Sequence, residues 1–284
     1  MLDFTVSTLT GRLVAGSDDG ASIARLCRDA GFVGVEGSIP FVDGLDDAAL
    51  ERVRAAFAAE SVRIDSFHLP FQDQFNDDLA SLYETERLEA VRCVTGWIDR
   101  AMRLGVRVGV VHPTTRKGFG VGREGFGRLW DALRRSLEAI DRHCQPSGFQ
   151  VAVENVPGAD RFGSVPDHFS RFAVDLPGSS VGFCLDTGHA LLSLPADPMA
   201  FYDAMRGHLV AFHLADNAGD RDSHLAPGRG LVPWSEFAKR LRTDRHEGTL
   251  CIETPPFAPG PPFEQREWTR MRVETGHLLE SRDG

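Results

Sequence analysis

The stretch VGFCLDTGHA, residues 181–190, joins a buried strand to a turn that carries two polar side chains. Residues 181–185 form an apolar run with the length and composition of a strand that is buried on both faces. The run ends on Asp186 and then turns through a Thr-Gly pair to His189. A buried carboxylate is costly unless a partner or a cation compensates its charge. The stretch therefore predicts a strand end whose acid faces a compensating group.

Similar short runs alternate with longer amphipathic segments along the chain. The expected strands occupy residues 3–7, 32–38, 62–68, 106–112, 149–155, 181–187, 209–216 and 249–255. Clear helical patterns occupy residues 46–60, 84–105 and 123–144. Asp46 or Asp47 is the expected N-cap of the first helix, and Gly105 is the expected stop of the second.

Alternation of strands and helices implies parallel strands joined by right-handed crossovers. Eight such units in 284 residues predict an α/β fold, a single closed (β/α)8 barrel. A doubly wound open sheet is the alternative, but no GxGxxG motif follows the first strand. No linker, low-complexity tract or internal repeat divides the sequence, so we expect one domain over residues 1–284.

Composition limits the location and the partners of the protein. No apolar stretch approaches the roughly 20 residues that span a bilayer, and the N-terminal residues lack the basic region of a signal peptide. The five cysteines are scattered without CxxC spacing, which indicates a reducing, cytoplasmic location. The net charge of −10 weighs against nucleic acid as the main partner.

Polar side chains gather at the carboxyl ends of the expected strands, where the functional face of such a barrel lies. They are His68, His112, Glu154, Asp186, His189, His213 and Glu253, with Asp222 and His224 in the loop after the seventh strand. Any one of them alone has an ordinary structural explanation, as a hydrogen-bonded histidine or a helix-capping acid. That explanation fits the remaining histidines, which are His143, His168, His208, His246 and His277.

The combination of these residues points to a metal ion. Barrel closure would bring four carboxylates to one mouth, where their charges repel unless cations compensate them. Neutral imidazoles interleaved with carboxylates are the ligands of a divalent transition metal, with Zn or Mn favoured. The sequence therefore predicts that Asp186 faces a metal.

Motifs along nearly the whole chain identify a resemblance. They are HLP (68–70), VHP (111–113), ENVPG (154–158), CLDTGHA (184–190), FHLADN (212–217), DSHLAPGRG (222–230) followed by Trp234, and IETPP (252–256). In their order and strand-end placement, the chain resembles the xylose-isomerase-like TIM-barrel superfamily. That superfamily holds sugar isomerases and epimerases together with endonuclease IV-type DNA repair enzymes.

The resemblance implies a ligand set for each branch of the superfamily. In the epimerase branch a single metal would be held by Glu154, Asp186, His213 and Glu253. In the endonuclease IV branch the cluster would also use His68, His112, His189, Asp222 and His224. The expected cofactor is a divalent ion (Mn, Zn, Co or Mg), no organic cofactor is expected, and a homo-oligomer is possible.

The leading hypothesis is an isomerase or epimerase that acts on a small ketose or polyol-like substrate through an enediolate. A metal would polarise the carbonyl, while Glu154 and Glu253 remove and return the proton. His112, His189 and Arg221 are the expected substrate-binding residues. Phe71, Phe119 and Trp234 either close the mouth or pack beneath it.

Three alternatives stay open. A metal-dependent lyase or dehydratase would use the same metal and the same acids. An endonuclease IV-like phosphodiesterase would use two or three metals to activate water and hold phosphate, although the acidic chain shows no obvious basic loops. A non-catalytic sugar-binding barrel is disfavoured because no expected acidic ligand is missing.

Overall fold

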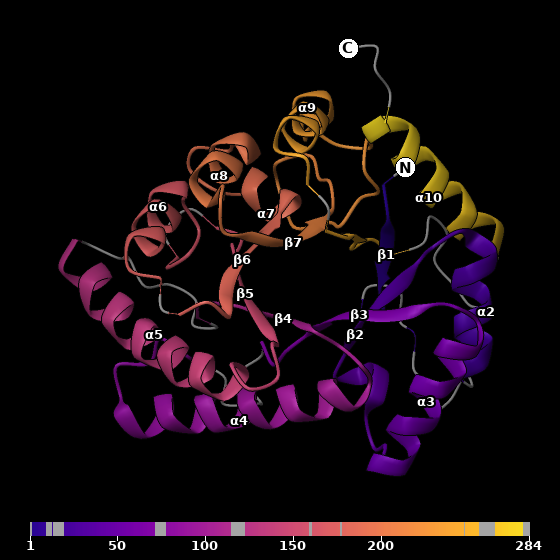
Figure 1. Cartoon of the computed structure of the whole chain (residues 1–284). Helices are drawn as coiled ribbons and strands as arrows, with labels where there is room; N and C mark the ends of the chain where they lie inside the picture. Colours follow the sequence, from indigo (N-terminus) through magenta and orange to yellow (C-terminus); the bar gives the residue numbers. More distant parts are fainter. Residues whose placement is uncertain are drawn as a thin grey trace.

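The computed structural model describes residues 2–9, 13, 20–71, 78–114, 123–158, 161–176, 178–246, 248–255 and 265–280. Within these ranges the strands form one closed parallel barrel in the order β1 to β8, surrounded by helices (Figure 1). The pairing of β1 with β8 closes the barrel, which confirms the predicted (β/α)8 fold and excludes the open sheet. No described helix has both the length and the hydropathy needed to cross a membrane.

The bounds of the elements follow the alternation expected from the sequence. The strands are β1 (Phe4–Ser7), β2 (Gly34–Ser38), β3 (Arg63–His68), β4 (Val108–Val111), β5 (Gln150–Glu154), β6 (Val181–Asp186), β7 (Leu209–Leu214) and β8 (Leu250–Ile252). The helices are α2 (Gly20–Ala30), η1 (Pro40–Val42), α3 (Asp47–Ala59), α4 (Glu84–Arg103), α5 (Arg123–Cys144), α6 (Pro166–Val174), α7 (Thr187–Leu191), α8 (Pro198–Met205), α9 (Trp234–Asp244) and α10 (Gln265–Glu280).

Local sequence signals explain where two of the predicted helices begin and end. Asp46 is the N-cap of α3, and its carboxylate accepts a hydrogen bond from Ala49 N at 2.8 Å. Helix α4 ends before Gly105, which adopts a positive φ of 84° that is favourable for glycine. Both predicted boundaries are therefore confirmed.

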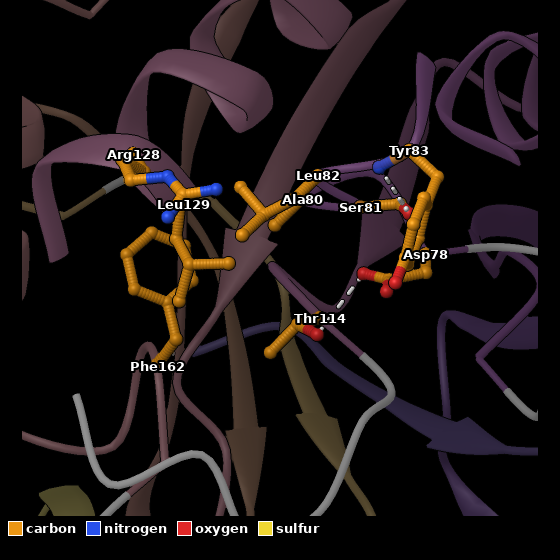
Figure 2. Close-up of a pocket in the computed structure, with 9 residues that line it drawn as sticks. All are labelled: Asp78, Ala80, Ser81, Leu82, Tyr83, Thr114, Arg128, Leu129 and Phe162. Carbon is orange, nitrogen blue, oxygen red and sulfur yellow. Dashed lines mark hydrogen bonds between the residues drawn. The ribbon is translucent and has the colours of Figure 1, made fainter. Parts of the chain in front are cut away.

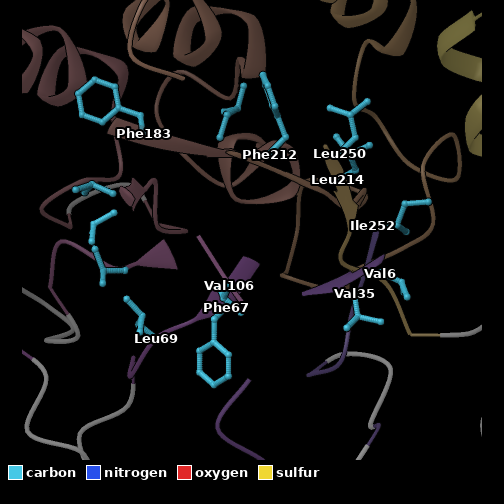
Figure 3. Packing of buried hydrophobic residues seen from close by; sticks show 14 of the residues in the cluster. Val6, Val35, Phe67, Leu69, Val106, Phe183, Phe212, Leu214, Leu250 and Ile252 are labelled. Carbon is cyan, nitrogen blue, oxygen red and sulfur yellow. The ribbon is translucent and has the colours of Figure 1, made fainter. Parts of the chain in front are cut away.

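A continuous apolar core fills the space between the barrel and its helices. Strand residues such as Val6, Phe67, Phe183 and Phe212 belong to it, and Figure 3 shows them distributed around the barrel. All four are at most 1% exposed. Burial of this layer stabilises the barrel and fixes the positions of the strand ends.

Inside the barrel, inward side chains lie in layers because alternate residues of each strand point to the interior. A buried apolar layer on one side consists of Val110, Ala152, Cys184 and Ala211. Two positions further along the same segments stand His112, Glu154, Asp186 and His213. The apolar layer therefore supports a polar layer at the carboxyl ends of the strands.

Close packing of β6 against β7 generates a stability prediction. A Cβ atom at Gly182 would lie 2.7 Å from the carbonyl oxygen of His208 and 2.8 Å from a methyl group of Val210. We expect Gly182→Ala to lower the free energy of unfolding by about 1–3 kcal/mol, because the backbone cannot move away without strain. Urea denaturation followed by circular dichroism measures this change.

Gly96 provides the matched control, because it lies within α4 and its Cβ would meet no described atom within 4 Å. Gly96→Ala should leave stability unchanged or raise it by up to about 1 kcal/mol through helix propensity. Equal denaturation midpoints for the two variants would contradict the packing argument.

Candidate metal centre

Four side chains meet where β5, β6, β7 and β8 end. Glu154 and Asp186 are the last residues of their strands, His213 lies within β7, and Glu253 directly follows β8. One ligand atom from each lies within 4.8 Å of the others, and all four residues are buried. Metal bonds to nitrogen and oxygen are about 2.0–2.2 Å long, so opposed ligands of one ion lie roughly 4 Å apart. The structure thus brings the predicted single-metal set together.

The imidazole of His213 lies between two carboxylates. Its Nδ1 is 3.0 Å from Glu154 Oε1 and 3.0 Å from Glu253 Oε2. A ring nitrogen carries at most one hydrogen, so it cannot satisfy two acids equally. A cation that contacts all three groups would resolve this competition.

Two buried oxygens of the group provide a test of whether a metal ion fits. Asp186 Oδ2 receives no hydrogen bond from the described residues, and Glu154 Oε2 receives no well-aligned one, although His112 Nε2 lies 3.1 Å from it. Burial raises the pKa of Asp186 to about 7, and the charges of Glu154 and Glu253 act in the same direction. Unsatisfied buried carboxylate oxygens beside an imidazole suit a divalent cation. The residues therefore fit the metal that the sequence predicted.

Electrostatics within the group favour the charged forms of His213 and Glu154. Burial alone would lower the pKa of His213, but Cys184 and the facing carboxylates raise it well above its ordinary value. Burial alone would raise the pKa of Glu154, but contacts with His213, His112 and His189 hold it well below its usual range. Without a metal, protons on the imidazoles balance the acids, and a bound cation would replace those protons.

Three further histidines are oriented in the manner of metal ligands. Each of His68, His189 and His224 places Nδ1 within hydrogen-bond distance of a backbone carbonyl. The acceptors are Leu69 O at 3.0 Å, Asn155 O at 2.8 Å and Glu253 O at 2.8 Å. Donation of Nδ1–H to a carbonyl leaves the Nε2 lone pair facing the centre, an arrangement that is common around bound metals.

Asp222 joins two of these histidines into an outer group. Its Oδ2 lies 3.3 Å from His189 Nε2 and 3.4 Å from His224 Nε2. His224 has a left-handed backbone with φ of 44°, which is uncommon outside glycine. The outer group is more open than the inner one, because the side chains of Asp222 and His224 are 30% and 24% exposed.

The loop that carries the outer group is held by Asp216, a residue that the sequence did not single out. Asp216 is fully buried, and its carboxylate accepts hydrogen bonds from three backbone N–H groups and one ring nitrogen. The donors are Asn217 N, Gly228 N, Val232 N and Trp234 Nε1. Trp234 is therefore a buried anchor of the loop, as the packing alternative predicted.

Two asparagines hold the turn after β6. Asn155 accepts from Asp186 N at 2.8 Å and donates to Asp186 O at 2.9 Å. On the other side, Asn217 donates to Gly188 O at 2.7 Å. Because the turn carries both Asp186 and His189, these amides fix two candidate ligands at once. Both asparagines lie inside the quoted motifs, but their partners are distant in sequence.

Glu36 is a second residue that sequence reasoning missed. It lies within β2, is 1% exposed, and its Oε2 is 3.1 Å from His213 Nε2. Ser66 Oγ donates to the same oxygen at 2.8 Å. The available signal was an acid inside a short, otherwise uncharged strand, which predicts a buried charge with a partner.

The structure also places the other predicted residues. His112 Nε2 lies 3.1 Å from Glu154 Oε2, and the ring of Phe71 packs 4.5 Å from that of His68. Arg221 is exposed, so its predicted contact with substrate stays a prediction. Residues 115–122, which include Phe119, lie outside the described residues.

A pocket of about 240 Å³ lies between the start of α4 and α5 (Figure 2). Apolar side chains such as Leu129 and Phe162 line it together with the hydrogen-bonded pair Asp78 and Thr114, whose side-chain oxygens are 3.0 Å apart. None of the predicted metal ligands lines this pocket. The centre is thus a separate feature, built from the strand ends.

Comparisons with known proteins agree with the fold. Uncharacterized protein y4fM of Sinorhizobium fredii (strain NGR234) is 26% identical over 251 residues, which cover 81% of this chain and 79% of the relative. A probable endonuclease 4 of Oleidesulfovibrio alaskensis is 30% identical over 177 residues, which cover 56% of this chain and 58% of the relative.

A solved structure shares the architecture. The crystal structure of a D-tagatose 3-epimerase-like protein superposes with a TM-score of 0.79 and 21% identity, covering 98% of this chain and 97% of that chain. At this identity the likeness shows the fold. Residues 24–271 match the family described as Xylose isomerase-like TIM barrel. Because that match spans most of the sequence and the barrel is closed, the chain belongs to the xylose isomerase-like TIM-barrel family.

Proposed function

We propose that the protein is a divalent-metal-dependent sugar isomerase or epimerase that acts on a small ketose or polyol-like substrate. The arrangement of Glu154 and Glu253 carries this proposal, because their carboxylates approach His213 Nδ1 from two different strands. Two acids that face one small site can exchange a proton with opposite sides of a substrate carbon. The similarity in fold to a D-tagatose 3-epimerase-like protein supports the sugar substrate.

In this proposal Glu154, Asp186, His213 and Glu253 hold the ion. The metal supplies electrophilic polarisation of the substrate carbonyl, which lowers the cost of forming an enediolate. One glutamate removes the proton next to the carbonyl, and the other returns it. His112 and His189 bind substrate hydroxyls, and Arg221 stabilises the developing oxyanion. The five cysteines are free, which supports the proposed cytoplasmic location.

A lyase or dehydratase would begin with the same proton abstraction and then expel a leaving group. The same metal, Glu154 and Glu253 serve both reactions. Product analysis separates them, because an isomerase or epimerase conserves the mass of the sugar while a dehydratase releases water.

A multi-metal phosphodiesterase is the second candidate function. The specific observation in its favour is the outer group of His189, Asp222 and His224, in which Asp222 lies between two imidazoles. Additional ions there could activate water and hold a phosphate. The similarity to a probable endonuclease 4 over 56% of the chain supports this candidate.

The number of metal ions per chain should distinguish the two functions. For the isomerase or epimerase we expect about one Mn, Co, Zn or Mg per chain, because the four inner residues satisfy a single divalent ion. Elemental mass spectrometry on protein purified without chelators measures this number. Asp222→Asn should leave the count unchanged if the inner site alone is occupied. Two or three zinc ions that fall by one in Asp222→Asn would instead favour the phosphodiesterase.

Proton transfer from the substrate provides a direct test of the leading proposal. The metal-loaded enzyme, incubated with ketohexoses, ketopentoses and keto-inositols in D₂O, should introduce deuterium at the carbon next to the carbonyl. Glu154→Gln and Glu253→Gln should each reduce the rate by about 100-fold or more, since general acid–base catalysis contributes about 10²–10⁴-fold. NMR and mass spectrometry measure the deuterium.

Glu236→Gln, a substitution of a half-buried acid on α9, is the control and should retain the wild-type rate. Circular dichroism of the Glu154 variant should show a folded barrel. Sugar interconversion without solvent deuterium, or full activity of Glu154→Gln, would contradict the proposed proton transfer.

The phosphodiesterase candidate makes its own prediction. With zinc restored, the protein should nick a duplex that contains an abasic site at low salt, and His224→Ala should reduce nicking by removing an outer ligand. Gel electrophoresis of a labelled duplex measures the product. Absence of cleavage by zinc-loaded protein would rule this candidate out.

A further inference from the structure

A second polar layer lies beneath His213, on the side of the barrel formed by β1, β2 and β3. Glu36 and Ser66 belong to it, and Ser7 stands next to Glu36 because these two residues are paired in the β1–β2 register. Across the barrel, the equivalent depth under β4–β7 is filled by the apolar layer. The interior is therefore asymmetric, and its polar half adjoins the ring of His213.

The contacts of His213 divide its two ring nitrogens between two environments. Nδ1 faces Glu154 and Glu253 in the proposed metal site, while Nε2 lies 3.1 Å from Glu36 Oε2. In a neutral imidazole only one ring nitrogen carries hydrogen, and the hydrogen-bond acceptors around the ring determine which one it is. Glu36 accepts the Nε2 hydrogen and leaves the Nδ1 lone pair directed into the metal site.

The acceptor of His213 differs from those of the neighbouring histidines. The Nδ1 atoms of His68, His189 and His224 meet neutral backbone carbonyls. His213 meets a carboxylate, which is a stronger acceptor than a carbonyl. A carboxylate behind a metal-bound imidazole fixes the ring and raises its basicity as a ligand.

The burial of Glu36 is costly for folding. Its Oε1 receives no hydrogen bond from the described residues, and the same holds for the hydroxyls of Thr5 and Ser7. A buried acid with an unsatisfied oxygen destabilises the fold. Glu36 is therefore held in the barrel by the contacts of its other oxygen, Oε2, with Ser66 and His213.

We infer that Glu36 is a positioning residue that fixes the orientation and tautomer of His213 and thereby sets the affinity of the centre for its metal. This inference rests on the metal centre of the proposed function and is independent of the reaction. It predicts that removing the charge of Glu36 lowers metal affinity by more than any loss of stability of the metal-free protein explains.

Glu36 could instead be a metal ligand itself, since Glu36, His213 and Cys251 form a group whose ligand atoms lie within 4.8 Å of one another. A metal at that group would need His213 Nε2 without hydrogen, while Nδ1 already faces the inner site. The two assignments differ in Cys251, which would be a ligand in one and a bystander in the other.

The experiment compares metal-free wild type, Glu36→Gln, Glu36→Met and Cys251→Ser. Affinity for Co²⁺ and Zn²⁺ is measured by competition with a chelating dye, and the visible absorption of bound Co²⁺ reports ligand geometry. We expect Glu36→Met to lower affinity about 10–100-fold and to shift the Co²⁺ spectrum. Glu36→Gln keeps an acceptor but loses the charge, so its affinity should be intermediate. Cys251→Ser should bind like the wild type.

Urea denaturation of the metal-free proteins provides the structural control. Glu36→Gln should be about as stable as the wild type, because its amide oxygen still accepts from Ser66 and His213, whereas Glu36→Met leaves both donors without that acceptor and should lose stability. Asp141→Asn is the matched substitution, since Asp141 is buried and accepts a hydrogen bond from Ser180 N, away from the centre. It should lower stability without changing the metal affinity.

Three results would overturn the inference. Unchanged affinity and spectrum in Glu36→Met would show that Glu36 does not act on His213. Loss of affinity that only parallels loss of stability would assign it a structural role. Equal loss in Cys251→Ser, with one ion fewer per chain, would make Glu36 a ligand. If the wild type binds no metal at all, that result contradicts the proposed metal centre itself and, with it, the role of Glu36 toward that metal.

Discussion

Repulsion among buried carboxylates around His213 is the constraint on which the rest of the site depends. Glu154 and Glu253 approach Nδ1 of the imidazole, and Glu36 approaches Nε2. Charges of one sign at this separation and burial require compensation by protons or by a cation. The imidazoles of His213 and His189 provide part of it in the metal-free protein, and the pKa of each is raised well above its ordinary value. A divalent ion would compensate the remaining charge, and metal binding is therefore the chemistry for which this interior is suited.

Apolar packing and hydrogen bonds outside the centre offset the free-energy cost of bringing these buried acids together. The apolar layer under β4–β7, which includes Val110 and Cys184, packs tightly and supports the ligand layer from below. On the side of the barrel formed by β1, β2 and β3, polar side chains take the place of apolar ones, and Glu36 contacts His213 there. Hydrogen bonds from Asn155 and Asn217 hold the turn after β6, and Asp216 holds the loop after β7. The turn that carries Asp186 and His189 and the loop that carries Asp222 and His224 are thus held by partners outside the centre.

The fold and most of the centre could be predicted from the sequence because both follow from local patterns. Apolar runs alternating with helices specify parallel strands, and closure then brings residues as distant as His68 and Glu253 to one mouth. Glu36 was missed because it lies inside β2 and not at its end, so its partner depends on which residues of other strands reach the same depth. The choice of ring nitrogen in His189 depends in the same way on a carbonyl of Asn155, 34 positions earlier in the chain. Periodicity contains no information about such contacts.

The difference in burial between the inner and outer groups bears on which chemistry the centre performs. Glu154, Asp186 and His213 are fully buried and held by strands, so the inner site exists before any substrate arrives. Asp222 and His224 are partly exposed and lie on a loop, so a ligand at the mouth can compete for them. A ketose needs one ion to hold two adjacent oxygens, and it needs hydrogen-bonding side chains around its remaining hydroxyls. Asp222 and the histidines of the outer group can form those hydrogen bonds if they bind no metal. A phosphodiester would need the same side chains as ligands. A buried inner site with a polar, accessible rim therefore supports the proposed small polyhydroxylated substrate over a phosphate backbone.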